Sequence, residues 1–344
     1  MILTGTQDSS RRENRPASRN SEQKELKPIE IDGRDLIRSV AFLADGKHFV
    51  SGGSEGKIRR RRVEDGQEVG TPMNAGSIVL SIAVSRDEKW IVSGSFELVM
   101  VWNAESHSKV TEWKAHSDWV QAVDVSRDGT RIATGSDDKT VCVWFLSTGQ
   151  RLLGPLQHDS KLAGLKFSPN GRLIATATWG PKVRICDSYN GSHCLVEFPI
   201  QVYSAVNQSL TWANDSKQLF VLSNDGNIHC LDVSTGTTLS KWAIHGSDKA
   251  RCISLASNGT FIAVSANSSV SFWDTATHER IGTVIEHTHV IKSMAISANY
   301  DVVVGGERTI TLRGLCDILP YRYFDNVRLH EKTVTSLSNH NPLR

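Results

Sequence analysis

Residues 116–144, HSDWVQAVDVSRDGTRIATGSDDKTVCVW, decide the fold of this chain. Short apolar runs at 122–125, 131–134 and 141–144 alternate with two polar turns, at 127–129 and 136–139. Asp, Asn and Gly tolerate the backbone angles of tight turns, and short runs rich in Val, Ile and Thr are typical of strands. The stretch therefore predicts consecutive antiparallel strands joined by hairpin turns.

The same pattern recurs along the chain at a nearly constant period. Seven four-residue segments align with one another, and their last residues lie 41 to 45 positions apart. They are Ser39–Phe42, Ser81–Val84, Ala122–Val125, Gly164–Phe167, Ser209–Trp212, Cys252–Leu255 and Ser293–Ile296. Each copy has room for four short strands and shows no helical periodicity, so the sequence predicts an all-β repeat array.

The composition excludes several classes of protein. The 344 residues include 39 Lys and Arg against 37 Asp and Glu, and the net charge of +2 excludes a globally polybasic nucleic-acid-binding tail. No apolar run approaches the roughly 18 to 20 residues of a membrane helix. Six scattered cysteines without a C-x-x-C pair, and a polar beginning without a signal-peptide pattern, predict buried thiols in a cytoplasmic or nuclear protein that is not secreted.

The stretch at 116–144 resembles a WD40-type repeat, and Trp273-Asp274 shows the dipeptide that gives this family its name. The resemblance extends over residues 27–316. It implies an all-β fold, a WD40-type β-propeller with four antiparallel strands per blade, and seven copies imply seven blades. In such rings the N-terminal segment usually supplies the outer strand of the last blade, which places a closing strand at Lys27–Ile31. This closure would tie the two ends of the chain together and leave no sheet edge that can propagate by pairing.

Polar segments flank the repeats. Residues 1–26 are rich in Ser, Arg, Asn, Gln and Glu, and they bury too little apolar surface to offset the entropy of ordering. We expect a disordered tail there. Residues 317–344 form a C-terminal tail that we expect to be partly packed on the ring or disordered.

The resemblance assigns a structural role to His116, Thr134, Asp138 and Trp144 of the third repeat, which match a hydrogen-bonded chain that fastens each blade in this family. A His, Thr and Asp set is also found in hydrolases, but no G-x-S-x-G nucleophile elbow accompanies it here. Other repeats keep only part of the set: the fourth has His158 and Thr176 without the Trp.

The first repeat departs furthest from the pattern, because Arg59-Arg60-Arg61-Arg62 replaces an apolar strand and Arg61 stands in the Trp position. Successive side chains of a strand point to opposite faces, so some of these arginines must enter packed interfaces. One interpretation is a degenerate blade whose arginines pair with Glu55, Glu64 or Asp65. The other is a candidate anion-binding site for phosphate or carboxylate groups.

Propellers of this family usually bind partners on the face where the first strand of each repeat begins. Of the fourteen positions that correspond across the repeats, five are basic and none is acidic. Together with two tryptophans they suit an acidic or phosphorylated peptide. The alternative is a solvated rim in which Asp35, Asp118 and Asp248 neutralise the basic residues. The predicted partner-binding rim consists of Arg38, Trp119, Trp179, Lys249, Arg251 and Lys292, and Lys161 is the fifth basic position.

No pattern for a catalytic site, a cofactor or a metal ion competes with this interpretation. We therefore predict a non-enzymatic protein–protein interaction scaffold that assembles a multiprotein complex. We expect it to be monomeric, to need no cofactor and to bind no membrane. The alternative is a nucleic-acid-associated subunit, in RNA processing or chromatin, that uses the basic rim and the arginine run.

Overall fold

The computed structural model describes residues 29–30, 35–191, 194–202, 209–244, 250–255 and 258–324. Side chains are not described at positions 29, 30, 194, 250, 251 and 255. The predicted disordered tail at 1–26 and the last residues of the C-terminal tail, 325–344, therefore lie outside the described part, and so does Lys249 of the predicted rim.

The described chain consists almost entirely of antiparallel strands. The first repeat forms a sheet of β2 (Ile37–Phe42), β3 (His48–Gly53), β4 (Lys57–Arg62) and β5 (Met73–Asn74). A seven-stranded sheet follows with β6 (Ser81–Val84), β7 (Trp90–Gly94), β8 (Phe96–Asn103), β9 (Lys109–Val125), β10 (Arg131–Ser136), β11 (Thr140–Phe145) and β12 (Arg151–Gln157).

The later repeats form separate four-stranded sheets. The first contains β13 (Leu162–Phe167), β14 (Leu173–Thr178), β15 (Val183–Asp187) and β16 (Cys194–Phe198). The second contains β17 (Leu210–Trp212), β18 (Gln218–Leu222), β19 (Asn227–Asp232) and β20 (Thr237–Ala243). The third contains β21 (Ala250–Leu255), β22 (Phe261–Ala266), β23 (Ser269–Asp274) and β24 (Arg280–Glu286).

The last sheet joins the two ends of the chain. It contains β25 (Ser293–Ile296), β26 (Asp301–Gly305) and β27 (Thr309–Gly314), and β1 (Ile29–Glu30) lies at its edge. The backbone register pairs Ile29 with Ile310 and Glu30 with Thr309. A strand from the beginning of the chain thus lies beside the last strand, within the segment 27–31.

The seven-stranded sheet exists because β9 runs through 17 residues without a break. Its first half pairs with β8 and its second half pairs with β10. One strand therefore serves as the outermost strand of one repeat and the innermost strand of the next.

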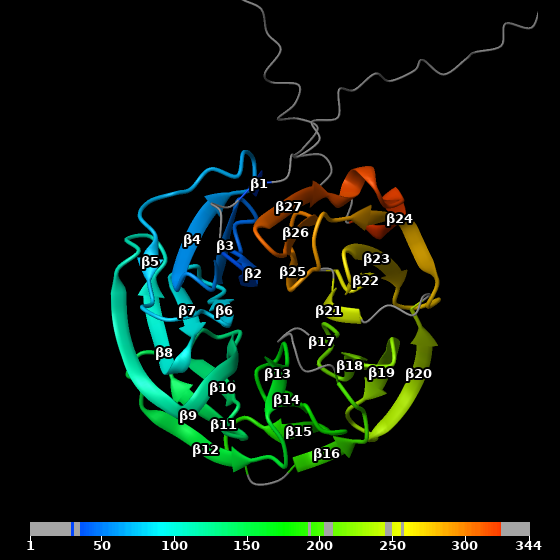
Figure 1. Ribbon diagram of the computed structural model, residues 1–344. Coiled ribbons are helices and arrows are strands. Elements are labelled where there is room, and N and C mark those ends of the chain that lie inside the picture. The colour runs from blue at the N-terminus through cyan, green and yellow to red at the C-terminus, as the bar shows by residue number, and fades with distance from the viewer. Residues whose placement is uncertain are drawn as a thin grey trace, which may run out of the picture.

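The sheets are arranged radially around a common centre, with the first strand of each repeat innermost (Figure 1). Neighbouring innermost strands are in contact around the whole circle, and β2 contacts both β6 and β25. The predicted all-β propeller of antiparallel strands is confirmed. Strands in the middle of a sheet are packed on both faces, so all six residues of β10 and of β22 are buried.

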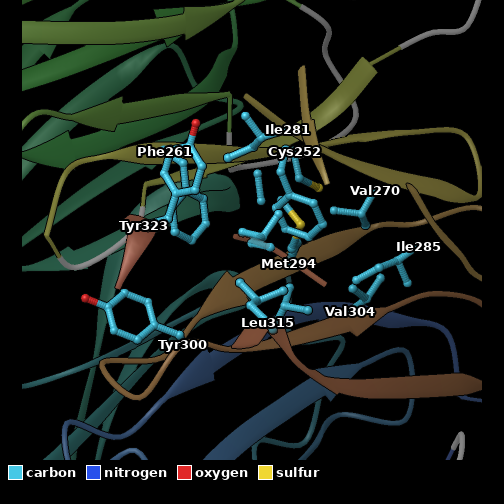
Figure 2. Packing of buried hydrophobic residues seen from close by; sticks show 14 of the residues in the cluster. Cys252, Phe261, Val270, Ile281, Ile285, Met294, Tyr300, Val304, Leu315 and Tyr323 are labelled. Atoms are coloured by element: carbon cyan, nitrogen blue, oxygen red, sulfur yellow. The ribbon is translucent and has the colours of Figure 1, made fainter. Parts of the chain in front are cut away.

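The segment after β27 is part of the packed structure. It forms two short 3₁₀ helices, η1 (Leu315–Asp317) and η2 (Tyr321–Tyr323). Leu315 and Tyr323 pack with Phe261 and Tyr300 in one apolar cluster between the last two sheets (Figure 2). The Tyr323 hydroxyl donates a 2.8 Å hydrogen bond to Asp274 Oδ2. The packed part of the C-terminal tail therefore reaches at least to residue 324.

Candidate functional site

The four polar residues of the third repeat lie within hydrogen-bonding distance of one another. His116 lies on β9, Thr134 on β10 and Trp144 on β11, and Asp138 lies in the turn that joins β10 to β11. Trp144 Nε1 donates to Thr134 Oγ1 at 2.9 Å, and His116 Nε2 lies 2.7 Å from the same oxygen. His116 Nδ1 lies 3.0 Å from Asp138 Oδ2. These side-chain hydrogen bonds therefore link β9, β10 and β11.

The environment of these four hydrogen-bonded residues favours a structural role over a catalytic one. Burial lowers the pKa of His116, so its ring is neutral at neutral pH. Burial acts to raise the pKa of Asp138, but hydrogen bonds from Thr140 and Ser117 outweigh it and the pKa is lowered. A neutral ring beside an ionised carboxylate donates from Nδ1 to Asp138 and accepts from Thr134 at Nε2. Thr134 is fully buried, so its hydroxyl is not available to a substrate.

Two other repeats show parts of the same arrangement. In the fourth repeat His158 Nε2 lies 3.0 Å from Thr176 Oγ1, and in the second repeat Trp102 Nε1 donates to Ser93 Oγ at 2.9 Å. Burial lowers the pKa of His158 to about 4 and that of His287 to about 4. Buried neutral histidines are therefore a shared feature of several blades.

Arg61 takes the place of the tryptophan in the first repeat. Its Nη1 donates a 2.7 Å hydrogen bond to Ser51 Oγ on the neighbouring strand, as Trp102 donates to Ser93. The backbone registers agree, since Arg61 pairs with Phe49 as Trp102 pairs with Ile91. Arg61 Nη2 donates to Glu68 Oε1 at 3.0 Å, which balances a guanidinium that is only 3% exposed.

The other arginines of the run also have partners within the chain. Arg59 binds both Glu55 and Glu68, and Arg62 binds Asp65. Arg60 Nη1 donates to the carbonyl oxygen of Ala104 in the next sheet at 3.0 Å. Of the partners suggested by the sequence, Glu55 and Asp65 are found, Glu64 forms no ion pair among the described residues, and Glu68 was missed. Carboxylates thus bind the guanidinium groups of Arg59, Arg61 and Arg62, and a carbonyl oxygen binds that of Arg60. This geometry favours the degenerate-blade interpretation over the anion-binding site.

The tryptophans of the predicted rim lie on neighbouring repeats. Trp119 packs edge-on against Phe96 with ring centroids 5.1 Å apart, and Phe96 is 44% exposed. Trp179 is 38% exposed, and Lys161 Nζ lies 5.6 Å from the centre of its ring. Lys161 also forms a 2.9 Å ion pair with Asp137. We call the set Phe96, Trp119, Lys161 and Trp179 the aromatic rim.

Backbone hydrogen bonds fix Trp119 and Trp179 within their own repeats, and the ion pair of Lys161 with Asp137 connects the two repeats. Asp137 N donates to the Trp119 carbonyl oxygen, and Trp179 N donates to the Lys161 carbonyl oxygen, each at 2.9 Å. Phe96 was not predicted from the sequence. Phe96 lies beside Trp119 because the register of β8 against β9 pairs the two residues, and this register is not apparent from the sequence.

The basic members of the predicted rim are less well placed. Arg38 lies on β2 and is half-buried, and its Nε is buried without a hydrogen-bond partner among the described residues. Lys292 directly precedes β25, and its backbone N–H donates to the Gly305 carbonyl oxygen at 2.8 Å. Arg251 lies on β21 and its side chain is not described. The structure thus brings Trp119 and Trp179 together and leaves the cluster of basic residues a prediction.

Comparison with known proteins gives the family. The model of the WD domain, G-beta repeat, matches residues 28–59, 107–144, 150–187 and 236–274. This chain contains WD40 repeats in these four regions. The second match contains the whole hydrogen-bonded set of the third repeat, and the first match ends at residue 59, where the arginine run begins.

Several curated proteins are similar to this WD40-repeat chain. Small ribosomal subunit protein RACK1y of Oryza sativa subsp. japonica is 33% identical over 150 residues, which are 42% of this chain and 44% of that protein. Protein SPA1-RELATED 4 of Arabidopsis thaliana is 26% identical over 217 residues, 59% of this chain and 27% of that protein. Protein groucho of Drosophila melanogaster is 28% identical over 160 residues, 44% of this chain and 21% of that protein.

The matched regions thus span less than half of each of these relatives. Among solved structures, the crystal structure of RRP9 WD40 repeats is similar with a TM-score of 0.71 and 18% sequence identity, over 85% of this chain and 98% of that chain. This likeness supports the WD40 propeller fold.

Metal ligands and reactive thiols are the next candidates for a functional site. The described residues contain no cluster of three or more His, Cys, Asp and Glu side chains that could hold a metal ion. Burial raises the pKa of the Cys142 and Cys230 thiols to about 11, so neither is a thiolate at neutral pH. In the same part of the chain, no helix is both long and apolar enough to span a membrane.

The buried histidines predict a loss of stability in mild acid. His158 and His287 have pKa values of about 4 in the folded protein, whereas an unfolded histidine titrates near 6.5. Between these values the unfolded chain binds protons that the folded protein does not, so the free energy of unfolding falls as the pH falls from about 6.5 to about 4. We expect a loss of at least about 1 kcal/mol for each histidine.

Urea denaturation at a series of pH values measures this loss. A His158→Gln variant, which cannot titrate, should lose less stability over the same range than the wild-type protein. Equal losses would show that His158 is not the titrating group.

The arginine run offers a matched pair of variants. We expect Arg61→Ala to lower the free energy of unfolding by about 2 kcal/mol, because it removes a buried side chain and leaves the buried Ser51 hydroxyl without its donor. Arg62→Ala removes an exposed arginine from the same strand and should leave stability unchanged. Chemical denaturation checks both, and a similar small effect of the two variants would exclude the structural role of Arg61.

Proposed function

We propose that this chain is a non-enzymatic protein–protein interaction scaffold that assembles a multiprotein complex through the faces of its propeller. The observation that carries the proposal is the aromatic rim. Exposed aromatic side chains grouped on neighbouring blades cost solvation free energy unless a partner covers them, and Trp is enriched among the residues that dominate binding energy. The propeller holds them on hydrogen-bonded strands, so little conformational entropy is lost on binding.

We infer that the ring has seven blades and that the N-terminal strand closes it. The seven copies of the repeat in the sequence support the number of blades, with β9 shared between the second and third repeats. The pairing of β1 with β27 supports the closure. A closed ring leaves only short sheet edges at its outer rim, which fits a monomeric propeller.

The partner that we propose is a protein in the cytoplasm or nucleus. The predicted rim of Arg38, Trp119, Trp179, Lys249, Arg251 and Lys292 suits an acidic or phosphorylated peptide, in which acidic groups contact the basic side chains and apolar groups contact the tryptophans. Lys161 already pairs with Asp137, so the aromatic surface carries more of the proposed contact here than positive charge does.

The nucleic-acid alternative is less well supported. It depends in part on Arg59–Arg62, and these side chains are engaged with Glu55, Glu68, Asp65 and the Ala104 carbonyl oxygen. Phosphate binding there would have to displace carboxylates that already form ion pairs. The observations therefore favour a protein partner.

Affinity purification of the tagged protein from native lysate tests the proposal. A Trp119→Ala, Trp179→Ala variant should lose its protein partners at least tenfold, because truncating a buried interface tryptophan costs about 2 kcal/mol or more. The control is Leu195→Ala, Leu239→Ala, which removes two exposed apolar side chains from the outer strands β16 and β20.

Nuclease treatment in parallel separates the alternatives. Partners that survive nuclease, disappear in the tryptophan variant and remain in the control would support the scaffold. Partners that disappear with nuclease would contradict it in favour of the nucleic-acid subunit. Partners that are unchanged in the tryptophan variant would contradict the assignment of the site.

A further inference from the structure

A second surface lies at the opposite end of the innermost strands from the aromatic rim. Trp119 precedes the run Val120–Val125 of β9, and Arg127 follows it in the turn to β10. Arg86 occupies the corresponding turn of the second repeat, between β6 and β7. The two arginines line a recess of about 600 Å³ together with Val125, Phe167, Pro169 and Asn214. We call it the basic recess.

The two arginines are exposed and available. Neither Arg86 nor Arg127 has an ion-pair or hydrogen-bond partner among the residues that the structure describes. The aspartates that follow them are used inside their own turns. Asp87 accepts hydrogen bonds from Ser85 Oγ at 2.6 Å and Lys89 N at 3.2 Å. Asp128 accepts hydrogen bonds from Ser126 Oγ at 2.5 Å and from Thr130 N at 3.0 Å.

An aspartate in the wall of the recess is already neutralised. Asp124 Oδ1 forms a 3.0 Å ion pair with Lys166 Nζ, and its Oδ2 accepts a 2.8 Å hydrogen bond from Phe167 N. Its charge is therefore balanced across the boundary between the third and fourth repeats. Arg86 and Arg127 remain as the cations of the recess whose guanidinium groups form no ion pair among the described residues.

The basic recess continues into a second space at the centre of the ring, whose wall has both polar and apolar groups. A second cavity of about 420 Å³ shares Asp124, Phe167 and Pro169 with it. The apolar part of its wall comes from the ends of the innermost strands and includes Phe42, Val84, Leu210, Ile253, Met294 and Ile296. The apolar side chains that lie beside the two arginines in the recess itself are Val125, Phe167 and Pro169.

We propose that the basic recess docks an acidic segment of a partner protein, with carboxylates on Arg86 and Arg127 and a neighbouring apolar side chain against Phe167 and Pro169. Arginine binds carboxylates with two parallel hydrogen bonds, which gives direction as well as charge. An extended polyanion fits less well, because the exposed Asp87, Asp128 and Asp215 lie in the turns around the recess. The site lies on the face away from the aromatic rim and so goes beyond the proposed function.

Fluorescence polarisation with a labelled, end-blocked peptide of two adjacent glutamates between leucines tests this proposal. The comparison peptide has glutamines in place of the glutamates. We expect the acidic peptide to bind the full chain, and an Arg86→Gln, Arg127→Gln variant to bind it at least tenfold more weakly. The matched control is Lys89→Gln, Arg172→Gln, which removes two exposed cations from turns on the same face that do not line the recess.

The outcomes separate this site from the aromatic rim. Binding that is unchanged in the control variant and in Trp119→Ala, Trp179→Ala, but lost in the double arginine variant, would establish the recess independently of the rim. Equal binding of the glutamate and glutamine peptides, or binding by the wild-type protein weaker than about 1 mM, would overturn the proposal. Tighter binding of oligouridine RNA than of the acidic peptide, lost in the double arginine variant, would overturn it in favour of a nucleic acid.

Discussion

A buried hydrogen bond between the second and third strands fastens each of the first three repeats of this propeller. A side-chain N–H on the third strand donates to a hydroxyl on the second: Trp144 to Thr134, Trp102 to Ser93, and Arg61 to Ser51. The groups are buried, so each needs its partner to offset lost hydration. Because propeller blades contact only their neighbours, each blade has to hold its own strands in register before the ring can pack.

The sequence alone predicts much of this architecture. The period of 41 to 45 residues and the turns rich in Asp, Asn and Gly lead to an all-β repeat array, and the stretch at 116–144 leads to the WD40 family. Both conclusions agree with the structure and with the family match. The seven copies depend on periodicity, which survives even where individual side chains have changed.

The role of Arg61 is harder to predict, because four consecutive arginines conflict with the alternation expected of a strand between packed faces. The available signal is chemical: Arg and Trp both present a side-chain N–H donor, and the Ser51 acceptor is retained. Glu68 is nine residues from Arg59 and reaches it only through the pairing of the chain after β4. Phe96 of the aromatic rim depends likewise on the register of β8 against β9, and the basic recess depends on residues from four repeats.

The aromatic rim and the basic recess lie at opposite ends of the same innermost strands, and they offer aromatic side chains and guanidinium groups, respectively. The aromatic rim lies where the innermost strands begin, and the basic recess lies where they end, so the length of these strands separates them. Each surface combines residues from neighbouring repeats that are fixed by hydrogen-bonded strands. On the two proposals made above, one partner binds at each face of the ring, and both bind to surfaces that belong to the same folded unit.

A double-mutant cycle at Thr134 and Trp144 tests the central claim most directly. Thr134→Val and Trp144→Phe each remove one partner of the buried hydrogen bond and retain most of the apolar side chain. If this bond fastens the blade, the free energies of unfolding of the single and double variants should give a coupling energy of about 1 kcal/mol or more. Strictly additive effects would contradict the account, because they would show that the two side chains stabilise the blade independently.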